Sequence, residues 1–334
     1  MRKIRIAQIG MNKNSHGIQV FSTLKSFPDI FDIAGYVLVE NEREECARRL
    51  HIFEGYREMS LEEILEDETI EAVTVETDEP DLLKYALLAA EHGKHIHMEK
   101  PGSPSLPDFK KLVQIMKDKE LVFHLGYMYR YNPMIANLLE RVKRDELGDI
   151  YSVEAQMNCR LKDAAREYLS ELPGGMTFYL GCHLIDLVLQ IQGQPLNIIP
   201  FNKSSLTDLS APKDNCMVIF EYPTGTSFIK TTAIEWGGFR RRQLVISGSK
   251  GTVELKPLET VACEGTDLLY TDERSYGTND TWHTQGEFRR SDTFDRYESM
   301  LNAFAKMVRG EIKNPYTYEY ELTLFETLMR CVDR

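Results

Sequence analysis

The chain has 334 residues, of which 42% are hydrophobic and 28% are charged, and its formal net charge is -12. This length predicts about two domains, and the composition is typical of a globular protein with an ample core. Lys and Arg form no run longer than residues 240–242, so the sequence predicts no nucleic-acid partner. No apolar run approaches the roughly 20 residues that span a bilayer, and residues 1–10 lack a signal-peptide pattern. We therefore expect no membrane partner and a cytoplasmic location.

The sequence predicts no metal site. Its cysteines are scattered, without a CxxC pair or the spacing of metal ligands, and they are Cys46, Cys159, Cys182, Cys216, Cys263 and Cys331. This usage favours reduced thiols. His95, His97 and Glu99 alternate on one face of a predicted strand, but a strand in a parallel sheet is usually buried, and no further ligand at matching spacing accompanies them.

Short apolar runs alternate with helical stripes through residues 1–125. The expected strands are 4–9, 33–39, 72–75, 95–98 and 122–125, and the expected helices are 18–27, 44–50, 61–65, a stripe containing Leu82 to Leu88, and 109–116. This alternation predicts a doubly wound parallel α/β sheet. Ligands of such sheets bind at the carboxyl edge, so Lys100, which follows the strand at 95–98, should stand at the mouth of a site.

Two glycines bound the loop between the first predicted strand and the first helix. Small residues such as Gly10 and Gly17 let a phosphate approach backbone N–H groups at a helix N-terminus, so this loop, with Met11 and Asn12, is a candidate dinucleotide site. The spacing is not GxGxxG, because Asn12 stands where the second glycine would be. A plain connection between strand and helix is the alternative interpretation.

Glu40 follows the second predicted strand. An acid at this point can accept hydrogen bonds from both ribose hydroxyls of an adenosine and repels a 2′-phosphate, which favours NAD over NADP. The alternative is that Glu40 begins a solvated charged loop over residues 40–45, since charge clusters usually face water.

The pattern changes in residues 126–334, where the predicted strands are longer and alternate with period two. The expected strands are 151–157, 216–222, 227–233 and 243–247, and the expected helices are 134–144, 293–308 and 320–332. Short turns at 223–225 and 249–251 predict a large, mostly antiparallel open sheet. We therefore expect an α+β domain, and because an open sheet with one exposed face often pairs with a copy of itself, we expect a homo-oligomer.

Residues 173–186 carry a second group of polar side chains. His183 and Asp186 lie three residues apart on a predicted helix, and Tyr179 precedes His183 by one turn, so the three can share one stripe. A histidine with an ordinary pKa of about 6.5 can take and return a proton near neutral pH, as the oxidation of an alcohol requires. The alternative is a buried histidine that is satisfied by Asp186.

Three motifs in this order resemble the Gfo/Idh/MocA family of oxidoreductases. They are Glu99-Lys100-Pro101, the segment from Gly126 to Pro133, and the pattern Gly-Gly…Gly-x-His-x-x-Asp over residues 174–186. The stretch 246–254 also resembles a hairpin in the second domain of that family. The resemblance implies a Rossmann-like dinucleotide-binding domain at 1–125 and a substrate-binding α+β domain at 126–334. It further implies an NAD-dependent dehydrogenase that acts on a sugar, a polyol such as inositol, or a related small molecule, assembled as a homodimer or homotetramer.

The resemblance also implies roles for individual residues. Lys100 would hydrogen-bond the reacting hydroxyl and lower its pKa, His183 would act as general acid/base, and Tyr179 would orient the substrate. Cofactor contacts are expected from Gly10, Met11, Asn12, Gly17, Glu40, Thr77, Glu99, Lys100 and Pro101. Substrate contacts are expected from Tyr127, Arg130 and Asp186.

Two positions keep a second class of function open. Tyr179 stands where the resemblance implies an aspartate, and Pro173 stands where it implies the first of three glycines. A carboxylate beside His183 would raise the basicity of that histidine. Tyr179 and the altered glycine loop at 10–17 make a non-catalytic protein that binds a dinucleotide or sugar and regulates a partner the alternative function. Redox-assisted glycoside cleavage is a third possibility within the family.

Overall fold

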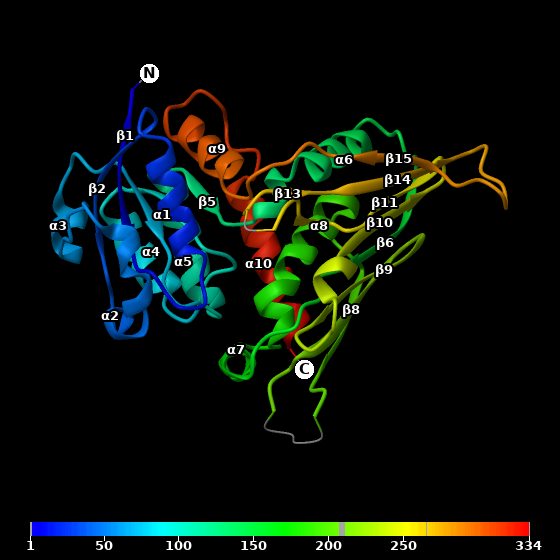
Figure 1. Cartoon of the computed structure of the whole chain (residues 1–334), viewed down its shortest axis with the longest axis horizontal. Coiled ribbons are helices and arrows are strands. Elements are labelled where there is room, and N and C mark those ends of the chain that lie inside the picture. The colour runs from blue at the N-terminus through cyan, green and yellow to red at the C-terminus, as the bar shows by residue number, and fades with distance from the viewer. Residues whose placement is uncertain (1, 207–210, 265, 334) are drawn as a thin grey trace. The chain divides into compact units, whose positions relative to one another are not determined.

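The computed structural model describes residues 2–206, 211–264 and 266–333 (Figure 1). The chain forms two compact units. The first consists of Met1–Met128 and Tyr297–Glu326, and the second consists of Tyr129–Arg296 and Thr327–Arg334. Each unit is therefore built from two separate stretches of the sequence.

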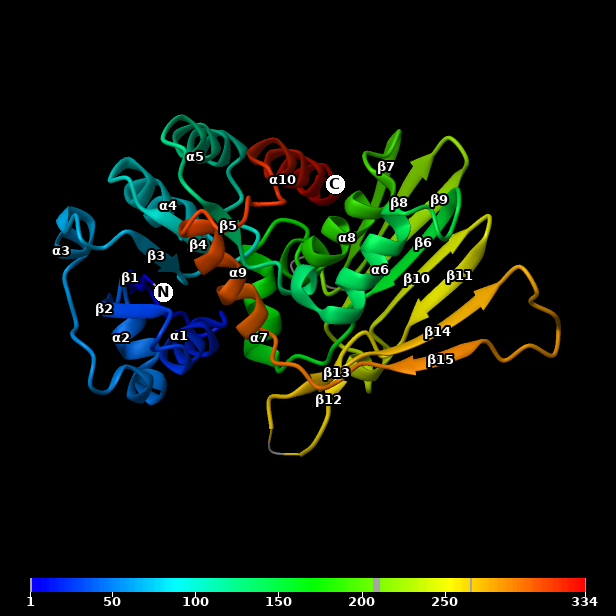
Figure 2. The ribbon, with the colours of Figure 1, turned by 90° about the horizontal axis from the view of Figure 1, so that it is seen from above.

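The first unit is a parallel sheet with helices on both faces. Its strands are β1 (Ile4–Ile9), β2 (Phe31–Val37), β3 (Ala72–Val75), β4 (His95–Met98) and β5 (Phe123–Leu125). Its helices are α1 (Gly17–Ser26), α2 (Glu42–Glu45), the 3-10 helix η1 (Ala47–Phe53), α3 (Leu61–Glu66), α4 (Leu82–Glu91), α5 (Leu106–Asp118), α9 (Glu298–Val308) and the greater part of α10 (Tyr318–Val332). Figure 2 shows α4 and α5 on one face of this sheet and α1 with α9 on the other.

The strand order β2-β1-β3-β4-β5 determines where a ligand can bind. The chain leaves β1 for β2 on one side and returns to β3 on the other, and all of these strands run parallel. Open α/β sheets bind ligands where the order reverses, beyond the carboxyl ends of the strands. The residues that follow β1, β3 and β4 therefore lie along the edge at which a ligand is expected.

Local capping signals explain where several helices begin. Ser60 and Glu63 form a reciprocal capping box at the start of α3. At the start of α6 (Pro133–Lys143), the side chain of Asn132 accepts hydrogen bonds from two backbone N–H groups of the first turn, and Pro133 is the first helical residue. The side chains of Ser60 and Asn132 accept hydrogen bonds from N–H groups that a helix N-terminus leaves unpaired. Pro133 has no N–H group that needs a partner.

Residues 297–326 lie in the first unit, whereas the division after residue 125 places them in the second domain. The reason is packing between segments far apart in the sequence. The ring of Phe325 stacks on that of Phe109, with centroids 4.1 Å apart, and Phe304 stacks on His124 at 5.4 Å. α9 also contacts α1. The sequence patterns at 293–308 and 320–332 predict two helices but carry no information about which sheet these helices cover.

The second unit is a large sheet with helices on one face. Its strands are β6 (Ile150–Gln156), β7 (Asn197–Lys203), β8 (Asn215–Tyr222), β9 (Gly225–Thr232), β10 (Gln243–Gly248), β11 (Gly251–Leu255), β12 (Thr260–Val261), β13 (Leu269–Tyr270), β14 (Asp272–Gly277) and β15 (Glu287–Arg290). Its helices are α6, α7 (Asp163–Tyr168), the 3-10 helices η3 (Leu169–Glu171) and η5 (Gly238–Arg241), the π-helical turn η4 (Thr177–Gly181) and α8 (Cys182–Gln192).

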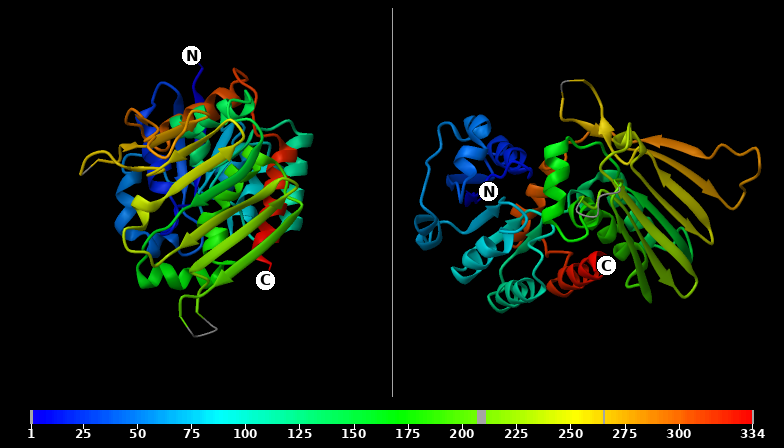
Figure 3. Two further views of the ribbon diagram at one scale, coloured as in Figure 1. Left: turned by 90° about the vertical axis from the view of Figure 1, so that its right-hand side faces the viewer. Right: turned by 90° about the horizontal axis from the view of Figure 1, so that it is seen from below.

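The main sheet of this unit has the order β15-β14-β11-β10-β6-β9-β8-β7. All neighbouring strands are antiparallel except β6 and β9, which run parallel. α8 packs against β6 and β9, and α6 packs against α8. Figure 3 (left) shows the opposite face of the sheet without a covering helix.

The predicted fold class, a doubly wound parallel sheet followed by an α+β domain with a mostly antiparallel sheet, is confirmed. β1, β3 and β4 have the predicted bounds. The sequence patterns did not reveal β7, α7, β14 or β15. Among the helices that the structure describes, none has both the length and the apolar character needed to cross a membrane.

Candidate functional site

The turn after β1 brings its backbone close to the segment that follows β3. Gly10 has φ 82°, and its N–H donates to the carbonyl of Val37 at 2.8 Å. A Cβ at this position would lie 2.5 Å from Cγ2 of Thr77. Only glycine combines this conformation with such a close approach, so Gly10 and Thr77 together shape the start of the candidate phosphate loop.

Asn12 stabilises the loop with its side chain, at the position where the sequence lacks a second glycine. Its amide nitrogen donates to the carbonyl of Thr77 at 2.8 Å, and its amide oxygen accepts from the backbone N–H of Ser15 at 3.0 Å. The loop leads into α1 at Gly17, whose N–H donates to the Ser15 hydroxyl at 3.2 Å. Asn12 and Met11 are both buried, so their side chains pack under the loop. The anion-binding role expected of the N-terminus of α1 stays a prediction.

Glu40 lies beside a polar hollow after β2. Its carboxylate accepts from the Tyr85 hydroxyl at 2.7 Å and pairs with Lys84, and hydrogen bonding from Lys84 lowers the pKa of Glu40. The hollow has a volume of about 440 Å³ and is lined by Val39, Glu40, Asn41, Glu42, Glu45, Thr77, Asp78, Asp81 and Lys84. Acidic side chains therefore dominate the place where the adenosine ribose is expected.

Glu42 was not a predicted site residue, yet it is buried beneath this loop. One carboxylate oxygen accepts from the Val39 N–H at 2.9 Å, and the other would lie 3.0 Å from a Cβ at Gly10. Burial raises the pKa of Glu42 to about 7. Residues 43–45, which follow it, are charged and exposed, so no local pattern distinguished Glu42 from a surface acid.

Lys100 is buried at the carboxyl end of β4, with 4% of its surface exposed. Its Nζ lies 3.6 Å from Oε1 of Glu99, which is also buried. Burial raises the pKa of the Glu99 carboxyl, while the charge of Lys100 opposes that increase. The peptide bond between Lys100 and Pro101 is cis. The predicted group Glu99, Lys100 and Pro101 thus places a cation and an acid in contact at the ligand edge of the sheet.

Glu76 and His97 are two further buried titratable residues near this edge. The sequence did not predict that they lie beside each other. Oε1 of Glu76 lies 3.9 Å from Nε2 of His97, and Nδ1 of His97 is hydrogen-bonded to Nδ1 of His124 at 2.7 Å. Burial raises the pKa of Glu76 and lowers the pKa of His97. Burial thus favours the neutral form of both groups.

Arg130 and Asp186 bind each other in the second unit. Nε and Nη2 of Arg130 donate to the two carboxylate oxygens of Asp186 at 3.0 and 2.8 Å, and Gln190 donates to the same carboxylate at 2.9 Å. Both charged side chains are buried. The pair joins the 3-10 helix η2 (Met128–Tyr131) to α8. The substrate contact predicted for these two residues stays a prediction, as does that for Tyr127, which is buried in the first unit.

His183 lies in the first turn of α8 and is 2% exposed. The ring of Tyr129 approaches it edge-on, with centroids 5.4 Å apart and an interplanar angle of 65°. α8 is buried on nearly all sides and packs against β6 and β9. A helix that is apolar on nearly all sides is expected in such a buried position.

Tyr179 lies in the π-helical turn η4, which precedes α8. Hydrogen bonds in a π-helix span five residues, so the predicted one-turn spacing between Tyr179 and His183 does not follow α-helical geometry. Tyr179 is half-buried, and its ring meets that of Tyr168 edge-on at 6.4 Å. Sequence periodicity gave no sign of the wider turn.

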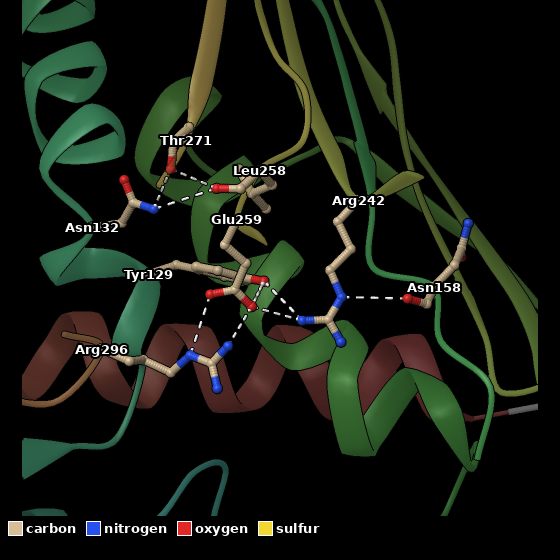
Figure 4. A network of polar contacts seen from close by, with 8 residues as sticks. All are labelled: Tyr129, Asn132, Asn158, Arg242, Leu258, Glu259, Thr271 and Arg296. Carbon is tan, nitrogen blue, oxygen red and sulfur yellow. Dashed lines mark hydrogen bonds and ion pairs between the residues drawn. The ribbon is translucent and has the colours of Figure 1, made fainter. Parts of the chain in front are cut away.

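A buried charged network in the second unit was also absent from the sequence-based predictions. Glu259 accepts hydrogen bonds from Tyr129, Arg242 and Arg296 (Figure 4). These residues are separated by up to 167 positions in the chain, from Tyr129 to Arg296, so no local spacing could have shown that they meet. Among the residues that the structure describes, no group of three His, Cys, Asp or Glu side chains is placed to hold a metal ion.

Comparisons with known proteins match both units. A family model described as "Oxidoreductase family, NAD-binding Rossmann fold" matches residues 4–127, and one described as "GFO/IDH/MocA C-terminal domain" matches residues 135–254. The uncharacterized oxidoreductase YhhX of Escherichia coli is 26% identical over 193 residues, which are 58% of this chain and 54% of that protein. The chain thus spans about half the length of this relative.

Two other similar proteins are aligned over more of their length. The myo-inositol 2-dehydrogenase of Thermotoga maritima is 22% identical over 314 residues, which cover 92% of this chain and 89% of that protein. The crystal structure of a putative NADPH-dependent oxidoreductase from Desulfitobacterium hafniense has a TM-score of 0.77 at 17% identity and covers 99% of this chain and 94% of its own. At this identity the structural likeness shows the fold. The two family matches, one in each unit, show that the chain belongs to the Gfo/Idh/MocA family of NAD(P)-binding oxidoreductases.

Proposed function

We propose that this protein is an NAD-dependent dehydrogenase that transfers a hydride between nicotinamide and a hydroxyl-bearing carbon of a sugar, a polyol or a related small molecule. The observation that carries the proposal is Lys100. It is a buried cation at the carboxyl end of β4 in a unit that matches an NAD-binding family model. Burying a charge is costly unless it is paired, and Glu99 pairs with Lys100 at the ligand edge of the sheet, where a reacting group would meet this cation.

The residues after β1 and β2 fit a dinucleotide. The close approach of Gly10 to Thr77 leaves no room for a side chain, and the N-terminus of α1 supplies N–H groups for a pyrophosphate. The acidic hollow around Glu40 would hold the ribose hydroxyls. Carboxylates outnumber cations among its described lining residues, with Lys84 as the one cation. A 2′-phosphate would be repelled there, which supports NAD over NADP.

Lys100 would donate a hydrogen bond to the reacting hydroxyl and stabilise negative charge as it develops on that oxygen. Glu99 beside it would hold the ammonium in place. Bound NAD would supply the hydride acceptor. His183 would accept the hydroxyl proton during oxidation and return it during reduction, which a histidine can do near neutral pH. Tyr179 would orient the substrate.

A spectrophotometric screen tests this proposal. Purified protein with NAD and a panel of sugars and polyols is expected to show the absorbance of reduced cofactor with at least one compound, and Lys100→Met is expected to abolish it. Lys94→Met is the matched control. Lys94 is also buried, but its Nζ donates to the carbonyls of Asp67 and Ile70 at 2.7 and 2.8 Å, so its loss should lower stability and spare turnover. Full activity in Lys100→Met would falsify the assignment.

A non-catalytic dinucleotide- or sugar-binding protein is the second candidate function. The loop around Asn12 favours it, because an amide side chain holds the turn where a second glycine would admit a phosphate. This candidate predicts that NAD raises the melting temperature while no compound of the panel is oxidised. Turnover at ordinary enzyme rates would remove it.

We also propose that the open face of the large sheet pairs with a second copy of the chain. Alternating residues of β7, β8 and β9 place apolar side chains on the face opposite to the buried Val218 and Phe220. They are Ile199, Phe201, Met217, Ile219 and Phe228. Phe201 is 44% exposed. A contiguous apolar face of this kind marks a protein interface, and a two-fold axis would bury it in a homodimer.

A further inference from the structure

Glu259 is the centre of a buried ionic network in the second unit (Figure 4). Its carboxylate is 4% exposed and accepts from the Tyr129 hydroxyl at 3.0 Å and from Nη1 of Arg242 at 2.7 Å. Nη2 and Nε of Arg296 donate to it at 2.8 and 3.2 Å. Burial alone would raise the pKa of Glu259, but the two guanidinium groups outweigh burial, and the pKa is lowered. The carboxylate is therefore ionised and held on three sides.

The network fixes the phenol of Tyr129 from several elements. Arg242 precedes β10, and its Nε donates to the carbonyl of Asn158, just after β6, at 3.3 Å. Its Nη1 also donates to the Tyr129 hydroxyl at 3.4 Å. Glu259 follows β11, and Arg296 precedes α9. A phenol that donates to one fixed carboxylate and accepts from one fixed guanidinium has little rotational freedom.

Two consecutive residues of η2 contact one face of α8. The ring of Tyr129 meets the imidazole of His183, and the guanidinium of Arg130 pairs with the carboxylate of Asp186. His183 and Asp186 are three residues apart in α8, so they lie on the same side of the helix. The bidentate pair fixes the position of the helix, and the aromatic contact bears on the imidazole itself.

We propose that Tyr129 is a positioning residue for the imidazole of His183, and that Glu259, with Arg242 and Arg296, is the anchor that holds Tyr129 in place. This inference rests on the proposed acid/base role of His183. A general base must lie within hydrogen-bonding reach of the proton that it takes. An imidazole that can turn away from that direction spends less time in the productive geometry, so loss of the Tyr129 ring lowers the rate of proton transfer rather than cofactor affinity.

Three variants separate the parts of this arrangement. Tyr129→Leu removes the aromatic ring beside His183 and is expected to lower kcat about tenfold or more, with KM for NAD unchanged. Tyr129→Phe keeps the ring but loses the hydroxyl through which the anchor holds it, so it should recover only part of that loss. Glu259→Gln keeps the shape of the anchor and removes its charge, and its side chain can still accept from the phenol, so its kcat should fall between those of the parent and Tyr129→Phe.

Glu273→Gln is the matched control. Glu273 is also a buried carboxylate bound by two arginines, Arg141 at 2.9 Å and Arg289 at 2.6 Å, and it lies in the same unit. It has no part in the Tyr129 network. Glu273→Gln should lower thermal stability about as much as Glu259→Gln does and leave kcat unchanged. An equal loss of kcat in both glutamine variants would show that Glu259 acts only through stability.

Histidine NMR tests the positioning role apart from turnover. The chain has 8 histidines, so the imidazole signals of the labelled protein can be assigned by difference with His183→Gln. Tyr129→Leu is expected to change the tautomer signal of the His183 imidazole, while Glu273→Gln leaves that signal as in the parent. Identical His183 signals in the parent and in Tyr129→Leu would overturn the inference. Wild-type turnover in His183→Gln would instead overturn the proposed acid/base role and leave the NMR result standing.

Discussion

Buried carboxyl groups give the ligand edge of the first unit a distinctive pH response. Burial raises the pKa of Glu42 to about 7, and it also raises the pKa of Glu76 and of Glu99. A carboxyl whose pKa is higher in the folded state keeps a proton that the unfolded chain releases. The stability that such a group contributes is complete below its unfolded pKa and is lost as the pH rises toward the folded pKa. Folding stability of this unit should therefore decline between about pH 5 and pH 7.

Glu42→Gln is expected to flatten this decline. Its pKa rises from 4.5 to about 7 on folding. At about 1.36 kcal/mol per pKa unit, this group changes the free energy of unfolding by at most about 3 kcal/mol over this pH range. Glutamine can still accept the Val39 N–H but does not titrate. The free energy of unfolding, measured with denaturant at pH 5 and pH 8, should change less in Glu42→Gln than in the parent. Glu45→Gln, which alters an exposed acid of the same helix, should behave like the parent, and an unchanged pH slope in Glu42→Gln would refute this account of its burial.

We propose that cofactor binding depends most on the turn between β1 and α1. Its conformation is set by Gly10 and by the side chain of Asn12 rather than by a series of glycines. Two constraints act at Gly10: a positive φ, and a neighbouring methyl group of Thr77 that would overlap any Cβ. The positive φ is a conformational constraint, and the contact with Thr77 is a steric one. Another glycine of the chain has the positive φ without a steric contact.

Gly93 is that matched position. Its φ is 74°, and no atom lies within 4 Å of where its Cβ would be. Gly93→Ala should cost about 1–2 kcal/mol of stability from the left-handed conformation alone. Gly10→Ala should cost more, because Thr77 must move, and it should weaken NAD binding at least about tenfold, or 1.4 kcal/mol. Calorimetric titration with NAD gives both affinities, and equal affinities for the two variants would show that this turn does not hold the cofactor.

Elements with a strong local pattern could be predicted from the sequence. The short apolar runs that became β1, β3 and β4 are continuous, buried and bounded by turn residues, so their bounds were correct. α9 was predicted as a helix, but its place in the first unit depends on Phe304 packing against His124, which no periodicity encodes. The π-turn at η4 was missed for a related reason, because its residues carry an ordinary helical pattern.

The candidate site was predictable to the same degree. Lys100 stood out because a charged residue follows a buried strand, and Gly10 because a glycine ends the first strand. Glu42 and Glu259 did not stand out, since a buried carboxylate differs from a surface carboxylate only through distant partners, such as Arg242 and Arg296 for Glu259. Charge patterns in a sequence show which acids exist, and the fold decides which of them are buried.

One face of the large sheet is not covered by helices of the same chain. Apolar side chains of β7, β8 and β9 lie on that face, while α8 packs on the other face and α6 packs on α8. The dimer proposed above would cover these side chains.

Ile219→Lys is expected to dissociate the proposed homodimer. Ile219 lies in the middle of β8, opposite Ile199 and Phe228 on its two neighbouring strands. A lysine there would place like charges across a two-fold axis. Light scattering after size exclusion should give the mass of two chains for the parent and of one chain for the variant. Ile312→Lys, at a residue of the first unit that is 41% exposed, should leave the mass unchanged, and a monomeric parent would exclude the proposed dimer.

We propose that hydride passes directly between a hydroxyl-bearing carbon of the substrate and nicotinamide. This transfer can be followed by mass spectrometry of the cofactor formed from a substrate that is deuterated at that carbon. We predict that the reduced cofactor gains one deuterium with the parent protein, and that Lys100→Met forms none above background. Reduced cofactor without deuterium, or deuterium transfer that is undiminished in Lys100→Met, would contradict the account.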